Sequence, residues 1–198
     1  GLLAEPAYSF SMVLIFRRGW QLLSTLGQKP DLAVEVSRRI ITLNRVSFIA
    51  ALMVFPFVFP AINPTNDSFG WVELFTFLGF ASVLFYNAIR QYQVAGIALM
   101  LAANFKIFFS ASVRGPQAGE QLFFIPLAMG LLLLYDWNLK KNPEAIPLWL
   151  ISLVNFLVLE LSNYGVLPTS PAFTPEVTHQ IFSINLVISL AISTAITF

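Results

Sequence analysis

Long apolar stretches alternate with short polar connections along most of this chain. Six stretches contain roughly 17 to 22 mainly apolar residues, the length that a helix needs to cross the hydrocarbon core of a bilayer. They cover residues 44–62, 70–89, 93–113, 121–137, 146–162 and 178–198. The pattern predicts an all-α membrane protein with six transmembrane helices, in which residues 44–198 form the transmembrane domain.

The basic residues between these stretches fall on alternating sides of the predicted membrane. The second connection holds Arg90, the third holds only Arg114, and the first and fifth hold no Lys or Arg. The fourth connection holds Lys140 and Lys141. The region that leads into the first stretch holds six basic residues, namely Arg17, Arg18, Lys29, Arg38, Arg39 and Arg45. Because positively charged connections stay in the cytoplasm, both chain ends of this predicted multi-pass protein are expected to face inward.

Residues 1–43 form a separate N-terminal region with an amphipathic pattern. Residues 9–28 are expected to form a helix in which Arg17 and Arg18 interrupt an apolar face, with Trp20 beside them. A Trp next to two Arg suits the headgroup layer, where the ring is half buried and the cations meet anionic lipid. We therefore expect an interfacial helix that has membrane lipids as its partner and Gly27 as its C-cap. It would serve either as a topology anchor or as a lipid-sensing or coupling element.

Composition supports the same class of protein and excludes several kinds of chemistry. The chain is 57% hydrophobic and 11% charged, whereas about 25% of residues are charged in an ordinary soluble domain. It has no Cys and a single His, His179, which excludes disulfides, thiol nucleophiles and multi-histidine metal sites. Gly-rich phosphate loops, G-x-S-x-G and H-E-x-x-H are missing as well. We predict no catalytic residue, no metal and no nucleic-acid partner, and the sequence leaves the cofactor unknown.

Charged residues inside membrane spans are energetically expensive, so they mark candidate sites. Lys106 lies roughly 10 Å from the outer end of the third stretch, given the rise of a helix. Five further polar residues share the outer half of the predicted bundle, namely Glu73, Asn104, Glu120, Asn155 and Glu160. The six together would form an outward-opening pocket in which Lys106 anchors an anionic ligand or headgroup. The alternatives are a structural ion pair between Lys106 and Glu160, and a Lys106 side chain that snorkels to the surface.

The last apolar stretch carries a stripe of small polar residues at every fourth position, namely Asn185, Ser189, Ser193 and Thr197. That spacing places them on one face of a helix. In lipid, such a stripe favours close helix–helix contact and interhelical hydrogen bonds. It would face either the rest of the bundle or a second copy of the chain, and the second arrangement predicts a homodimer.

Three segments of the chain together carry a resemblance to a known family. They are the basic lead at 26–52, the small-residue turn and aromatic–apolar stretch at 115–136, and the last stretch at 181–198. Together they resemble the six-transmembrane N-terminal sensor modules of bacterial histidine kinases and class III nucleotide cyclases of Bacteroidetes type. The resemblance implies a sensor or regulatory domain that relays ligand or membrane state through its last helix to a cytoplasmic output domain beyond Phe198.

A second interpretation follows from the residues alone. The chain would be a non-catalytic integral membrane subunit of a larger energy-transducing or transport complex, with partner membrane subunits against its apolar faces. A small transporter is disfavoured, because the two halves show no matching interruption that would indicate an internal repeat.

Overall fold

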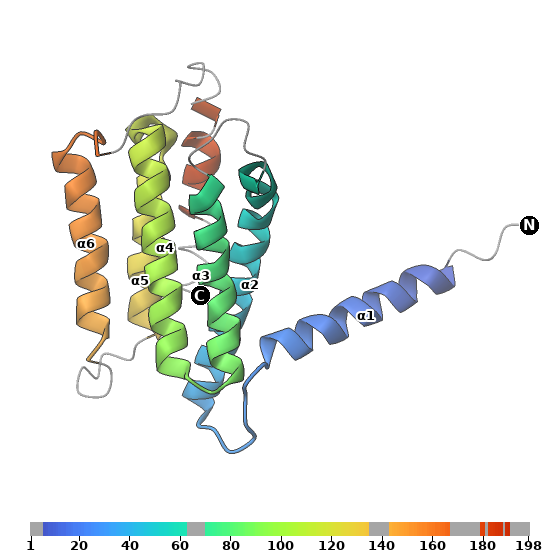
Figure 1. Ribbon diagram of the computed structural model, residues 1–198. Coiled ribbons are helices and arrows are strands. Elements are labelled where there is room, and N and C mark those ends of the chain that lie inside the picture. Colours follow the sequence, from blue (N-terminus) through green and yellow to red (C-terminus); the bar gives the residue numbers. More distant parts are fainter. Residues whose placement is uncertain are drawn as a thin grey trace, which may run out of the picture.

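The computed structural model describes residues 6–62, 70–134, 143–166, 179–180, 182–187 and 189–190. All regular structure in this part of the chain is helical (Figure 1). The elements are α1 (Pro6–Ser24), α2 (Val34–Ile62), α3 (Gly70–Ala88), α4 (Tyr92–Arg114), the 3-10 helices η1 (Pro116–Ala118) and η2 (Glu120–Phe123), α5 (Phe124–Leu134) and α6 (Ala145–Leu161). The predicted all-α fold is confirmed for these residues.

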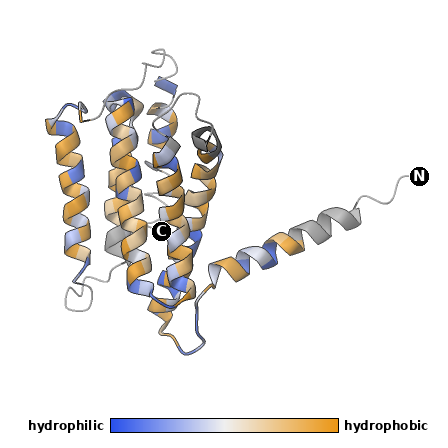
Figure 2. Ribbon diagram, in the orientation of Figure 1, coloured by the Kyte–Doolittle hydropathy of each residue, from blue (hydrophilic) through white to orange (hydrophobic). Residues whose placement is uncertain are grey.

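Three helices are long and apolar enough to cross a membrane. They contain the segments Val34–Val58, Trp71–Ala88 and Tyr92–Arg114, of 25, 18 and 23 residues, and apolar residues run along their whole length (Figure 2). Helix α6 is apolar but has 17 residues. The predicted 121–137 stretch begins as η2, and α5 continues it to Leu134, the last residue that the structure describes there. The chain is therefore a helical membrane protein with three spanning candidates among the described residues, while six spans stay a prediction.

Helices α2, α3 and α4 lie side by side and run alternately up and down (Figure 1). Leu43 of α2, Val83 of α3 and Leu99 of α4 belong to one buried cluster between them. Gly79 lets α3 approach α4 closely, since a Cβ at this position would lie 2.9 Å from the Cβ of Ala102. Small residues at a helix contact are typical of packing in lipid, where backbones approach closely to gain van der Waals contact.

Helix α4 also packs against the second half of the chain. Ile107 of α4 shares a buried cluster with Phe124 of α5 and Leu159 of α6. Gln93 at the start of α4 donates hydrogen bonds of 3.2 Å to the carboxylate of Glu144, which directly precedes α6. Helices α4 and α6 therefore begin at the same end of the bundle and run parallel.

Helix α1 leaves the bundle at the end where α2 begins and projects sideways (Figure 1). Its Ile15 and Phe16 are 71% and 74% exposed. Arg17 and Arg18, the predicted membrane anchors, are exposed as well. Trp20 packs edge-on against Phe48 of α2, with ring centroids 6.2 Å apart. Ile15, Phe16 and Leu22, which is 72% exposed, therefore have little cover within the described residues, which is the arrangement expected of a helix that lies on a membrane.

Candidate functional site

The loop after α1 is held by a buried amide from α2. Asn44 Nδ2 donates to the carbonyl oxygens of Ser24, at 3.1 Å, and of Leu26, at 3.0 Å. Asn87 Nδ2 of α3 in turn donates to Asn44 Oδ1 at 2.7 Å. Asn44 and Asn87 are both fully buried. Since a buried polar group left without a partner costs about 1–3 kcal/mol, these bonds fix how the loop sits on the bundle.

Gly27 brings the same loop into direct contact with α3 and α4. The Tyr92 hydroxyl at the start of α4 donates to the Gly27 carbonyl at 2.7 Å. Gly27 has a φ of +81°, and a Cβ there would lie 1.9 Å from the carbonyl oxygen of Asn87. Gly27, the predicted C-cap, therefore has the left-handed backbone expected of such a residue, but it lies in the loop because α1 already ends at Ser24. We call Asn44, Asn87 and Tyr92 with the loop carbonyls that they bind the clasp, and this end of the bundle the clasp end.

The opposite end of the bundle carries a compact turn. Helix α4 ends at Arg114, and Gly115 and Gly119 then take φ values of +76° and +71° around η1. The Arg114 guanidinium pairs with the carboxylate of Glu120, which is itself buried. We call residues 115–123 with this ion pair the turn, and this end of the bundle the turn end.

The last apolar stretch is hydrogen-bonded to this turn. Asn185 Nδ2 donates to the Ala118 carbonyl at 2.8 Å, and Ser189 Oγ donates to the Leu122 carbonyl at 3.0 Å. Two residues of the predicted stripe thus face their own bundle, which corresponds to the intramolecular alternative. The other two, Ser193 and Thr197, lie outside the described residues.

Steric contact strengthens the same docking. A Cβ on Gly119 would lie 2.8 Å from the ring of Phe182, so the glycine leaves room for the aromatic side chain one helical turn before Asn185. Together, these contacts make the turn the docking site of Phe182, Asn185 and Ser189.

The six residues of the predicted outer pocket fall into separate groups. Lys106 forms an ion pair with Glu73 of α3 and not with Glu160, so the expected Lys106–Glu160 alternative is wrong. The side chains of Lys106 and Glu73 are only 23% and 16% exposed, so they form a partly buried pair between α4 and α3. Glu120 belongs to the turn, as described above. The pocket around Lys106 as a whole stays a prediction.

Asn104 and Asn155 build a polar ladder between α4 and α6. Asn104 Nδ2 donates to Ser152 Oγ at 2.9 Å, and Asn155 Nδ2 donates to Asn104 Oδ1 at 3.3 Å. Asn104 and Ser152 are buried. In a membrane such bonds act as interhelical links, since the surrounding lipid offers no alternative partner.

Glu160 interacts with the segment that follows its own helix. The Tyr164 hydroxyl donates to Glu160 Oε1. Burial raises the pKa of Tyr164, and the hydrogen bond to Glu160 and its negative charge raise it further. Tyr164 therefore keeps its proton and remains a donor to Glu160.

Sequence reasoning missed the clasp. No local pattern marks Asn44, Asn87 or Tyr92 as the partner of a loop. The one usable signal was a glycine followed by Gln-Lys-Pro after an amphipathic helix, which marks a tight turn. Which side chains bind that turn depends on packing across residues far apart in sequence. Among the described residues, no group of His, Cys, Asp and Glu could hold a metal ion.

No protein-family model, curated protein or solved structure matches the chain. The class that the fold defines is a helical membrane protein, with the clasp at one end of its bundle and the turn at the other.

Proposed function

We propose that this chain is a membrane sensor or regulatory domain whose last helix follows the state of the turn end. One observation carries the proposal. The last apolar stretch is bound through Asn185 and Ser189 to backbone carbonyls of the turn. A rearrangement of that turn would displace the last helix without any further intermediary.

The ion pair of the turn is suited to receive the input. Arg114 has a side chain that is 35% exposed, whereas the Glu120 side chain is 11% exposed. An anionic ligand that engaged Arg114 from outside would compete with Glu120. The buried carboxylate would then lose its partner, and because an uncompensated buried charge is strongly unfavourable, the turn would have to move.

The proposed topology is six spans with both ends on the cytoplasmic side of a bacterial inner membrane. The distribution of Lys and Arg supports it. The clasp end would then face the cytoplasm and the turn end the outside. In this arrangement the last helix carries the displacement inward to an output domain, and a homodimer would form through the part of the stripe that the turn does not occupy.

A second candidate is a non-catalytic subunit of a larger membrane complex. The outward side of α6 favours it, because Leu150, Val154 and Leu161 are 47%, 52% and 86% exposed. Partner helices would cover that side in place of lipid.

Distance measurements between spin labels would test the relay. The chain lacks Cys, so nitroxides can be attached at Gln91→Cys and Val187→Cys, both of which are exposed positions. Glu120→Gln weakens the ion pair of the turn, and we expect it to shift the distance by about 1–2 Å, the size of helix shifts in switching proteins. Glu144→Gln, the same change at the clasp end, is the matched control and should leave the distance unchanged. An unaltered distance in Glu120→Gln would contradict the relay.

A further inference from the structure

Helix α1 has an apolar half and a polar half. At about 100° of rotation per residue, the apolar half carries Ile15, Phe16, Leu22 and Leu23. The polar half carries Arg17, Arg18, Gln21 and Ser24. Ile15, Phe16 and Leu22 are exposed, so much of the apolar half is left uncovered by the described residues. Contiguous apolar surface of this kind marks an interaction site.

The contacts of α1 with α2 turn the apolar half toward the membrane. Ser24 Oγ, on the polar half, accepts a hydrogen bond of 3.1 Å from Arg45 Nε. Trp20, at the border of the two halves, packs against Phe48, which lies further along the spanning segment of α2 and therefore deeper in the bilayer. These two contacts set the rotation of α1 about its own axis, so its apolar half faces the bilayer and its polar half faces water.

An anionic bilayer surface fits this half of α1. The helix leaves the bundle sideways beside the first spanning candidate (Figure 1), and a helix at this level with its apolar half turned inward lies in the membrane interface. Arg18 is exposed close to the border of the apolar half, where a long side chain reaches the lipid phosphates. Exposed Arg17 adds a second positive charge, and α1 contains no acidic residue, so the charge of the helix complements anionic lipid.

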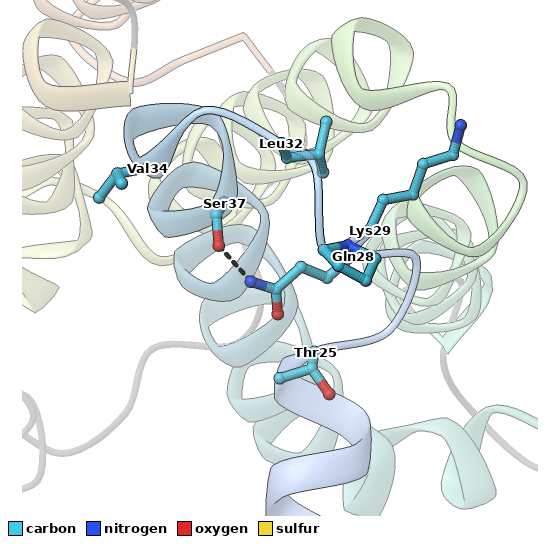
Figure 3. Close-up of a pocket in the computed structure, with 7 residues that line it drawn as sticks. Thr25, Gln28, Lys29, Leu32, Val34 and Ser37 are labelled. Carbon is cyan, nitrogen blue, oxygen red and sulfur yellow. Dashed lines mark hydrogen bonds between the residues drawn. The ribbon is translucent and has the colours of Figure 1, made fainter.

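Contacts on both sides of the end of α1 hold it at a fixed angle to α2. Before that end, the Arg45 guanidinium lies over the Trp20 ring, 5.8 Å from its centroid. After it, the clasp binds the loop, and Gln28 Nε2 donates to Ser37 Oγ of α2. Figure 3 shows Gln28 and Ser37 turned toward one another between the loop and the helix. A tilt of α1 on the membrane would therefore act on the loop and, through it, on the clasp.

We propose that α1 binds the surface of an anionic bilayer through its apolar half and couples this binding to the clasp. Of the two roles that its sequence suggests, α1 is the coupling element and not only a topology anchor. The inference goes beyond the proposed function, because it adds an input from the membrane surface at the clasp end. It holds whether the chain is a sensor or a subunit.

The collision accessibility of single spin labels tests the binding. The full chain, which lacks Cys, is placed in phosphatidylglycerol nanodiscs with a nitroxide at Leu22→Cys or Gln21→Cys, neighbouring exposed positions on opposite halves. We expect the label at position 22 to collide with lipid-soluble oxygen and the label at position 21 with a water-soluble nickel complex. Equal access of the nickel complex to both labels would overturn the bilayer as the occupant. Equal protection of position 22 in phosphatidylcholine nanodiscs would overturn the preference for anionic lipid.

Amide hydrogen exchange of the loop after α1 tests the coupling in the same nanodiscs. The double variant Ile15→Ser, Phe16→Ser removes apolar surface from two exposed positions. We expect the Gln28 amide, which is bonded to the Thr25 carbonyl at 3.0 Å, to exchange at least about fivefold faster, the lower end of typical coupling between distinct sites. Gln21→Ser changes the polar half and is the matched control, with an expected change of less than about twofold.

Two outcomes would overturn the coupling. Unchanged exchange in the double variant would leave α1 as an anchor only. Equal acceleration by Gln21→Ser would mean that any change in α1 loosens the loop, whether or not it alters the surface that binds the membrane. Circular dichroism reports the helix content of each variant, and where the double variant loses helix, the smaller change Leu22→Ser on the same half takes its place.

Discussion

Several polar side chains in this protein complete the hydrogen bonding of turns that lie far from them in the sequence. Asn44, Tyr92, Asn185 and Ser189 each donate to a backbone carbonyl outside their own helix. At or near a membrane, a carbonyl that no helix satisfies needs such a donor, because lipid cannot provide one. These four residues therefore fix where helices and loops meet.

Gly27 is the residue at which this contact is closest. Gly27→Ala should lower the free energy of unfolding in detergent by about 1–2 kcal/mol from the left-handed backbone alone, and the overlap with the Asn87 carbonyl adds to that loss. Denaturant titration followed by circular dichroism measures it. Gly19→Ala is the matched control, because a Cβ at Gly19 meets nothing within 4 Å. Equal stability of the two variants would contradict the docking of the loop.

The bond between Asn44 and Asn87 predicts coupled energetics. Asn44→Ala leaves two loop carbonyls without a donor and the Asn87 amide without an acceptor. It should lower the free energy of unfolding by about 1–3 kcal/mol. In the double variant with Asn87→Ala, the total loss of unfolding free energy should be smaller than the sum of the two single-variant losses by about 0.5 kcal/mol or more. The same titration measures all three variants, and strictly additive losses would show that the two amides do not interact.

At the scale of elements, an ion pair links α3 and α4 within the bundle. Lys106→Met leaves the carboxylate of Glu73 without its cation and should lower the free energy of unfolding in lipid nanodiscs by at least about 1 kcal/mol. Glu73→Gln should do the same for Lys106. The double variant should regain most of the loss, since neither charge is then left alone. If both single variants were as stable as the unaltered chain, Lys106 would be solvated at the surface instead.

Element positions could be predicted from the sequence far better than element contacts. Apolar length alone located α3, α4 and α6 to within a few residues, and it located the C-terminal end of α2. Helix α2 begins at Val34, before its apolar stretch, because the basic segment that leads into the first predicted span is helical as well and runs directly into it. The fourth stretch begins as a 3-10 helix after two glycines with positive φ, a backbone detail that hydropathy does not carry. Partners such as Asn44 and Asn87 are 43 residues apart, so their meeting depends on how two helices are rotated and not on any local pattern.

At the scale of the whole molecule, the proposed topology predicts that the two ends of α4 face opposite sides of the membrane. Single cysteines at Gln117, in η1, and at Gln91, before α4, would be treated with a membrane-impermeant maleimide. The chain has no other Cys, so any label reports the introduced position. Gln117→Cys should react in intact cells, and Gln91→Cys only after the membrane is permeabilised. Reaction of both from one side would contradict the topology.

The measurement that tests the central claim most directly is the composition of the assembly isolated from its native membrane in mild detergent, by native mass spectrometry. A sensor or regulatory domain predicts an assembly mass that is a whole multiple of one polypeptide containing this sequence. If the chain were instead isolated in a fixed stoichiometric ratio with different membrane proteins, the sensor proposal would be contradicted. That result would support a subunit of a larger membrane complex.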